Sequence, residues 1–231
     1  MKQRSFYLLI ILILASFFLV ACKSTSNFDN TAEEYDYALH YALETANESA
    51  ITTLYFKITQ TSAFLPESLS FIKENASKIP GMDKLLAEWT SYMSSYAMNW
   101  FEDLRSYLNG LVSKMTFENP IETVKAGDAS ASKAFQATYG EALRLCLEQN
   151  LENIGLEKWD ELVKQYRAWV ETSKILFDED NPKLEEVDIK KELASYTCNL
   201  YFSSLEDAEI LLRTTPDPNA DKTVSKVFGL D

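Results

Sequence analysis

The feature that most constrains the fold is a long stretch with helical periodicity, residues 82–114. Its apolar side chains recur at steps that fit one face of an α-helix, namely Leu86, Met93, Ala97, Trp100, Leu104, Leu108, Leu111 and, just beyond, Met115. Such spacing is typical of an amphipathic α-helix. Four further aromatic residues widen this face, namely Trp89, Tyr92, Tyr96 and Tyr107. A face this wide predicts contact with more than one other helix, with an apolar pocket along it as the alternative.

The same periodicity recurs along most of the chain. We expect further helices over residues 30–55, 65–79, 120–126, 129–153, 156–175, 189–213 and 220–228. Asn119, Asp128 and Asp188 directly precede three of them, and short polar side chains at such positions are typical helix caps. No stretch alternates apolar and polar residues as a half-buried strand does. The predicted fold class is therefore all-α, as a single bundle-like domain over residues 31–231.

The first 22 residues predict an export signal. Lys2 and Arg4 precede an unbroken run of mostly apolar residues, 6–20, and a small residue, Ala21, stands before Cys22. This order is the pattern of a secretory signal peptide. An uncleaved membrane helix is the alternative, but the run is shorter than the roughly 20 residues that a span needs.

Residues 19–22, Leu-Val-Ala-Cys, resemble the lipobox of bacterial lipoproteins. The resemblance implies cleavage before Cys22 and acylation of its thiol and its new amino group. Residues 1–21 are then the lipoprotein signal peptide, and residues 22–30 are the lipidated cysteine with a short polar tether.

The charge of the chain restricts its partners. The formal net charge is −13 for the 231 residues, and it becomes −15 once the two basic residues of the leader are removed. Nucleic acid and anionic lipid headgroups repel a domain this acidic. We therefore exclude nucleic acid as a partner and expect membrane contact through the lipid on Cys22.

Two cysteines remain after Cys22, and an exported protein can form disulfides. In a helical arrangement, Cys198 and Cys146 both fall in line with apolar neighbours, and free cysteines are commonly buried like small hydrophobic residues. Two helical positions rarely meet disulfide geometry by chance. We favour two buried thiols over a Cys146–Cys198 disulfide, which stays open as the alternative.

The chain carries little that points to catalysis. His40 is its only histidine, and on a helix it lies beside Asp36 and Glu44, which predicts an exposed histidine and not a metal ligand or catalytic base. The acidic stretch 177–187 lacks the glycine and the spacing of a calcium loop. We expect no metal, no cofactor and no catalytic residue, although a hydrolase with paired carboxylates remains compatible with the composition.

Several short motifs resemble, in order, a bacterial family of uncharacterised proteins, DUF4197. The motifs are Leu65-Pro66-Glu67, Met115-Thr116-Phe117-Glu118, Gly127-Asp128, Ala131 to Phe135, Arg213, Pro216 and Lys226-Val227-Phe228-Gly229. Ser132 and Ala134 depart from the threonine and tyrosine of that family's pattern. The resemblance covers residues 31–229 and implies an exported, all-helical domain with no assigned activity.

These observations predict a membrane-anchored, non-catalytic envelope lipoprotein on the periplasmic side of the inner or outer membrane. Its helical domain would bind an envelope protein or an apolar ligand. An envelope hydrolase and a purely structural component are the alternatives. We also predict that the last segment, residues 220–229, docks on the long helices through Val224, Val227 and Phe228, because these three residues share one side of a short helix.

Overall fold

The computed structural model describes residues 30–59, 65–177, 187–216 and 218–230. The predicted signal peptide, Cys22, and residues 178–186 of the acidic stretch lie outside these ranges. The described residues form eight α-helices and one short 3-10 helix, and none of them forms a strand, which confirms the all-α class.

Most helices begin and end within a few residues of the predicted bounds, but the helix predicted over 65–79 is a 3-10 helix followed by a short α-helix. The helices are α2 (Ala32–Thr59), η1 (Glu67–Leu69), α3 (Ser70–Ala76), α4 (Met82–Val112), α5 (Pro120–Lys125), α6 (Ser130–Leu151), α7 (Glu157–Phe177), α8 (Ile189–Thr214) and α9 (Lys222–Phe228). No helix in these ranges combines the length and the apolar character that crossing a membrane requires.

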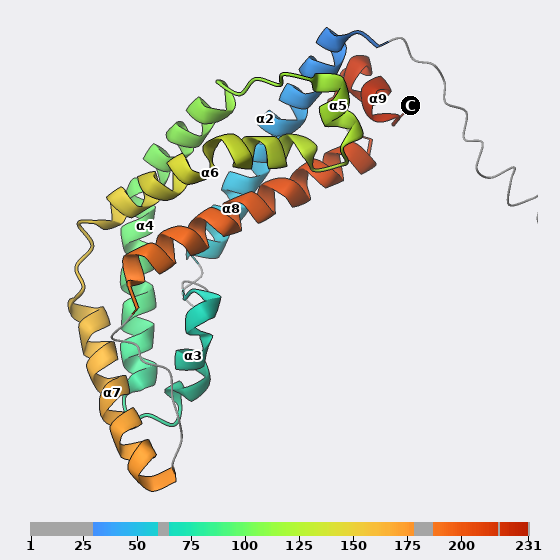
Figure 1. Cartoon of the computed structure of the whole chain (residues 1–231). Helices are drawn as coiled ribbons and strands as arrows, with labels where there is room; N and C mark the ends of the chain where they lie inside the picture. The colour runs from blue at the N-terminus through green and yellow to red at the C-terminus, as the bar shows by residue number, and fades with distance from the viewer. Residues whose placement is uncertain (1–29, 60–64, 178–186, 217, 231) are drawn as a thin grey trace, which may run out of the picture. The chain divides into compact units, whose positions relative to one another are not determined.

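Helix α4 connects two regions of the domain. It has 31 residues and is therefore about 46 Å long at 1.5 Å per residue. Its second part packs antiparallel to α2, where the Ser94 hydroxyl donates to the carbonyl of Ile58 over 3.0 Å, and it also contacts α6. Its first part packs against α3 and α7 (Figure 1).

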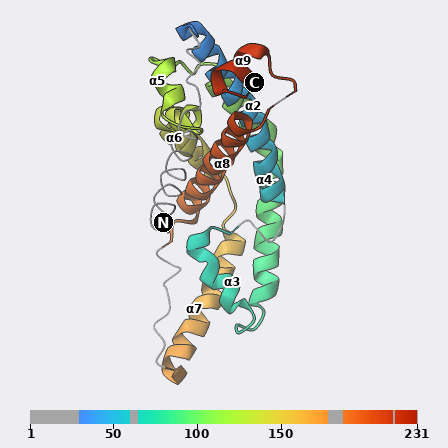
Figure 2. The ribbon, with the colours of Figure 1, turned by 90° about the vertical axis from the view of Figure 1, so that its right-hand side faces the viewer.

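We name the two regions by what joins their helices. The polar-anchored region comprises α2, α5, α6, α8, α9 and residues 94–112 of α4, with α8 packed on both α2 and α6. The aromatic region comprises α3, α7 and residues 82–93 of α4. Figure 2 shows α5 and α9 beside the start of α2, and α3 and α7 beside the first half of α4.

The predicted aromatic face of α4 is core at Trp89, while Tyr92, Tyr96 and Tyr107 are partly buried and pack against the core. Trp89 and Met93 are fully buried, and the Trp89 ring lies 5.4 Å from that of Trp159 on α7. Contact with several helices is thus confirmed.

The core draws on every long helix. Its main cluster of buried apolar side chains comes from residues 39–205, inside the compact unit Ala32–Asp231. A unit with its own core can fold without the segment that precedes it.

Of the three predicted caps, only one is confirmed. The Asp188 carboxylate accepts a hydrogen bond from the backbone N–H of Lys191 at the start of α8. Asn119 makes no side-chain cap bond, and α6 begins after Ala129, not after Asp128.

The docking of the C-terminal segment is confirmed, although only Val224 of the three predicted contact residues is buried, while Val227 and Phe228 are partly buried. Helix α9 packs against α2 and buries Val224 almost completely. The Asp221 carboxylate caps it by accepting hydrogen bonds from the N–H groups of Thr223 and Val224.

Candidate functional site

A buried ion pair lies where α6 begins. Glu209 on α8 is completely buried, and Arg213, one turn further on, is 5% exposed. Their Oε1 and Nη2 atoms are 2.5 Å apart. The Glu209 carboxylate also accepts hydrogen bonds from the backbone N–H groups of Ala131 over 3.0 Å and Ser132 over 2.6 Å. Because the first N–H groups of a helix have no partner within it, Glu209 caps α6 in place of the predicted Asp128.

Arg213 extends this contact to two further segments. Its Nη1 donates to the carbonyl of Gly127 over 2.9 Å, in a turn where Gly127 adopts a φ of 127° that favours glycine. The guanidinium group also lies 4.7 Å from the ring centroid of Phe228 on α9. Burial lowers the pKa of Arg213, while the Glu209 charge opposes that shift. The pair therefore joins α8, the α5–α6 turn and α9.

A surface hollow of about 660 Å³ lies where α2 begins and where the segment after α4 leads into α5. It is lined by Ala32, Glu33, Asp36, Tyr37, His40, Thr116, Phe117 and Pro120. His40 is less exposed than predicted, because its ring packs edge-on against Phe117 with 5.2 Å between centroids. Its Nε2 lies 3.8 Å from the Asp36 carboxylate. Within the described ranges no three His, Cys, Asp or Glu side chains are grouped to hold a metal ion.

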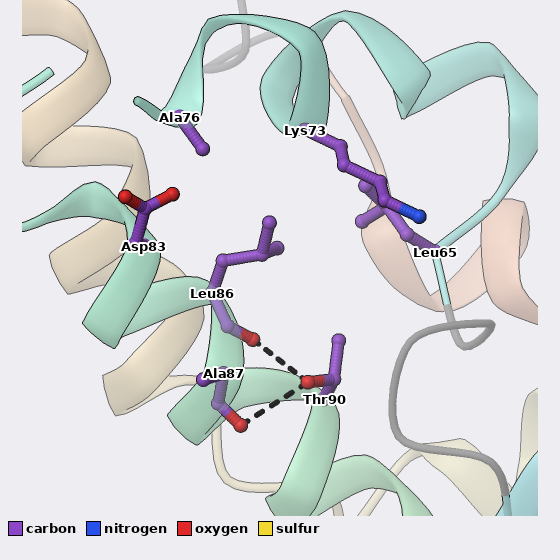
Figure 3. A pocket seen from close by; sticks show the side chains of 7 residues that line it. All are labelled: Leu65, Lys73, Ala76, Asp83, Leu86, Ala87 and Thr90. Carbon is purple, nitrogen blue, oxygen red and sulfur yellow. Dashed lines mark hydrogen bonds between the residues drawn. The ribbon is translucent and has the colours of Figure 1, made fainter. Parts of the chain in front are cut away.

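A second pocket, of about 410 Å³, lies between α3 and α4 (Figure 3). Four apolar side chains line it, namely Leu65, Ala76, Leu86 and Ala87, together with Thr90, Lys73 and Asp83. The Thr90 hydroxyl donates to the carbonyls of its own helix at Leu86 and Ala87, so it is already satisfied.

The chemistry of this second pocket, the α3–α4 pocket, favours binding over catalysis. Its lining has one carboxylate, Asp83, and one ammonium group, Lys73. Carboxyl-based glycoside hydrolysis uses two carboxyl groups that face the scissile bond. The pocket therefore offers an apolar surface with a charged rim, in the size range of small-molecule sites, about 300–1,000 Å³.

The two cysteines are free thiols, as favoured from the sequence. Cys198 is buried, its thiol lies 3.7 Å from the Gly140 carbonyl, and burial raises its pKa to about 11. Cys146 is only partly buried, which corrects the expectation that both would be core residues. The reason is local: Cys146 lies beside the inward-facing Leu147 at the edge of the buried stripe of α6.

The family model for proteins of unknown function DUF4197 matches residues 29–229. The chain belongs to the DUF4197 family. No curated protein and no solved structure matches it.

In this DUF4197 chain four motif residues that lie far apart in the sequence meet at the buried pair. Gly127, Ala131 and Phe228 contact Glu209 or Arg213 directly, and Arg213 is itself a motif residue, whereas Phe117 lines the hollow of about 660 Å³. Glu209 belongs to none of those motifs, and only its partner Arg213 could have pointed to it, because oppositely charged residues four apart on a helix are neighbours.

Proposed function

We propose that this DUF4197 chain is a lipid-anchored, non-catalytic binding protein of the bacterial envelope that takes an apolar ligand in the α3–α4 pocket. The observation that carries the proposal is the lining of that pocket, where four apolar side chains surround a space of about 410 Å³.

The burial of the lining supports a ligand and not only a surface contact. Ala76 is 3% exposed, whereas Ala87 is exposed. Leu65 and Leu86 are partly buried and pack against the core. An apolar ligand would thus cover side chains that water now reaches, and each Å² of apolar surface covered is worth roughly 25 cal/mol.

The envelope location rests on the leader of the sequence. Residues 19–22 resemble a lipobox, and a diacyl or triacyl anchor at Cys22 would hold the acidic domain at a membrane that its own surface charge does not favour. Cys22→Ala should abolish metabolic incorporation of labelled palmitate and release the protein from the membrane fraction. Wild-type protein that carries no label would contradict the anchor.

Ligand binding is tested with residues 23–231 and the neutral fluorescent probe N-phenyl-1-naphthylamine. We expect saturable binding to the wild-type protein and a loss of at least tenfold in affinity for Ala87→Trp, which fills the pocket. Ala168→Trp is the matched control, because Ala168 is an exposed alanine on α7 that does not line the pocket. Equal binding by both variants would place the probe elsewhere and contradict the proposal.

A further inference from the structure

The two charged groups of the α3–α4 pocket lie at opposite ends. Figure 3 shows the Lys73 ammonium group on the side of Leu65 and the Asp83 carboxylate on the side of Ala76, with Leu86 between them. The aliphatic stem of Lys73 forms part of the wall and carries its charge to the end of an apolar space.

Lys73 differs from several other lysines of this acidic chain. Lys84, Lys125, Lys158 and Lys191 each form an ion pair with a carboxylate, the closest being Lys158 with Glu88 at 2.7 Å. No ion pair joins Lys73 to a side chain within the described ranges. Its ammonium group is therefore available to an anion that enters the pocket.

Asp83 at the other end has a local electrostatic partner. It lies in the first turn of α4, a helix of 31 residues that begins after Gly81 and receives no side-chain cap. A negative charge is favoured at this position by the unpaired N–H groups and the dipole of a helix. The carboxylate thus needs no ligand cation, and it disfavours a second anion at the Ala76 end.

We propose that the ligand of the α3–α4 pocket is a single-chain anionic amphiphile. Its hydrocarbon chain lies over Leu86 and Ala87, and its carboxylate or phosphate head pairs with Lys73 at the Leu65 end. The inference rests on the function proposed above and adds to it the charge of the ligand and its orientation in the pocket.

The test measures how well four amphiphiles displace N-phenyl-1-naphthylamine from residues 23–231. Tetradecanoate and tetradecyl phosphate carry the anionic head, tetradecanol a neutral head, and tetradecylamine a cationic head, all below their micellar concentrations. An exposed ion pair is worth up to about 1 kcal/mol. We therefore expect both anions to bind about fivefold more tightly than the alcohol, and the order of the two anions identifies the preferred head.

Lys73→Gln should remove the preference for anions and leave the affinity for tetradecanol unchanged. Lys78→Gln is the matched control, since Lys78 is an exposed lysine five residues further on that does not line the pocket. Lys73→Glu should make tetradecylamine the tightest ligand.

The outcomes separate the two proposals. If the probe binds and the anions and the alcohol compete equally in wild type, or if the amine binds most tightly, the inference is wrong and the apolar pocket stands. If Lys73→Gln and Lys78→Gln weaken the anions equally, the effect is only one of net charge, and the inference is again wrong. A probe that does not bind in the pocket at all overturns the proposed function and the inference together.

Discussion

The two regions of the domain are held together by different chemistry. In the polar-anchored region, the Tyr201 hydroxyl donates to Asn47 Oδ1 over 2.6 Å, and Asn47 donates to Asn109 over 2.6 Å. Tyr201 and Asn47 are 1% and 2% exposed. Together with Glu209–Arg213, these contacts fix the mutual register of α2, α4, α6 and α8.

The aromatic region places its ion pairs at the surface. Lys158 and Glu88 are 41% and 38% exposed, and Arg167 and Glu171 are more exposed still. Its interior is joined by rings, such as Trp89 on Trp159 and Phe71 on Tyr166. Buried polar partners demand one geometry, whereas apolar contacts tolerate small shifts. The comparison shows that the buried polar contacts between helices lie in the polar-anchored region, whereas the α3–α4 pocket lies in the region whose helices are joined by rings.

The largest expected effect is the loss of the buried pair. Arg213→Met leaves the Glu209 carboxylate buried without its counter-charge and should lower the free energy of unfolding by about 3–5 kcal/mol. Arg167→Met is the matched control in the aromatic region, because it removes an arginine from an exposed ion pair with the same four-residue spacing. It should lower the free energy of unfolding by less than about 1 kcal/mol. Urea titration measures both. Similar costs would remove the distinction between the two regions.

The second effect concerns the C-terminal helix of the polar-anchored region. Phe228→Ala removes the ring beneath Arg213 together with part of the contact between α9 and α2, and should cost about 1–3 kcal/mol. For a domain of this size that is a fall of several degrees in Tm, measured by calorimetry. A chain that ends at Thr215 should melt lower still, and an unchanged Tm would show that α9 is not structural.

A third prediction concerns high pH. Burial raises the pKa of Tyr201 above its ordinary value of about 10. The neutral Tyr201 hydroxyl of the folded protein makes its full contribution to stability below about pH 10, where tyrosine is also neutral in the unfolded chain. This contribution is lost as the pH rises through the pKa that Tyr201 has in the folded protein. Tyr201→Phe should cost about 0.5–1.5 kcal/mol at pH 8 and less at pH 11.5, as measured by urea titration at the two values. A constant difference would contradict this assignment.

The smallest effects concern the two thiols. Cys198→Ala should cost about 1 kcal/mol, and Cys146→Ala less, because only Cys198 is buried. The Tm of the wild-type protein and of both variants should stay the same when a reductant is added. Mass spectrometry of the non-reduced protein should find free thiols at Cys146 and Cys198. A linked Cys146–Cys198 peptide would contradict the structure.

Sequence reasoning predicted local structure better than the contacts between helices. The stripe of Leu39, Ala46 and Leu54 on α2 is buried as its spacing predicts, and Asp188 caps α8. The cap of α6 could not be predicted, because the capping carboxylate belongs to Glu209. This residue lies 78 and 77 residues along the chain from Ala131 and Ser132, whose N–H groups donate to it. A local candidate such as Asp128 is always visible in a sequence, whereas a distant one depends on how two helices pack.

The sequence left an apolar pocket along residues 82–114 open as an alternative, but its lining and the environment of His40 were beyond prediction for the same reason. Helical spacing placed His40 opposite the apolar stripe, but the segment after α4 crosses there and covers the ring with Phe117. The α3–α4 pocket joins Leu65, Lys73 and Leu86 from three segments, and a single helical pattern contains no information on the space between two of them.

The sequence by itself determined the all-α class, the bounds of the helices and which face of each is apolar, because these depend on spacing within a few residues. Tertiary structure decided which polar groups share the interior and where the helices leave a space. Those outcomes depend on antiparallel packing that brings Ala131 to Glu209 and α3 to α4. A buried carboxylate is stable only where distant donors converge on it, and only the folded chain brings them together.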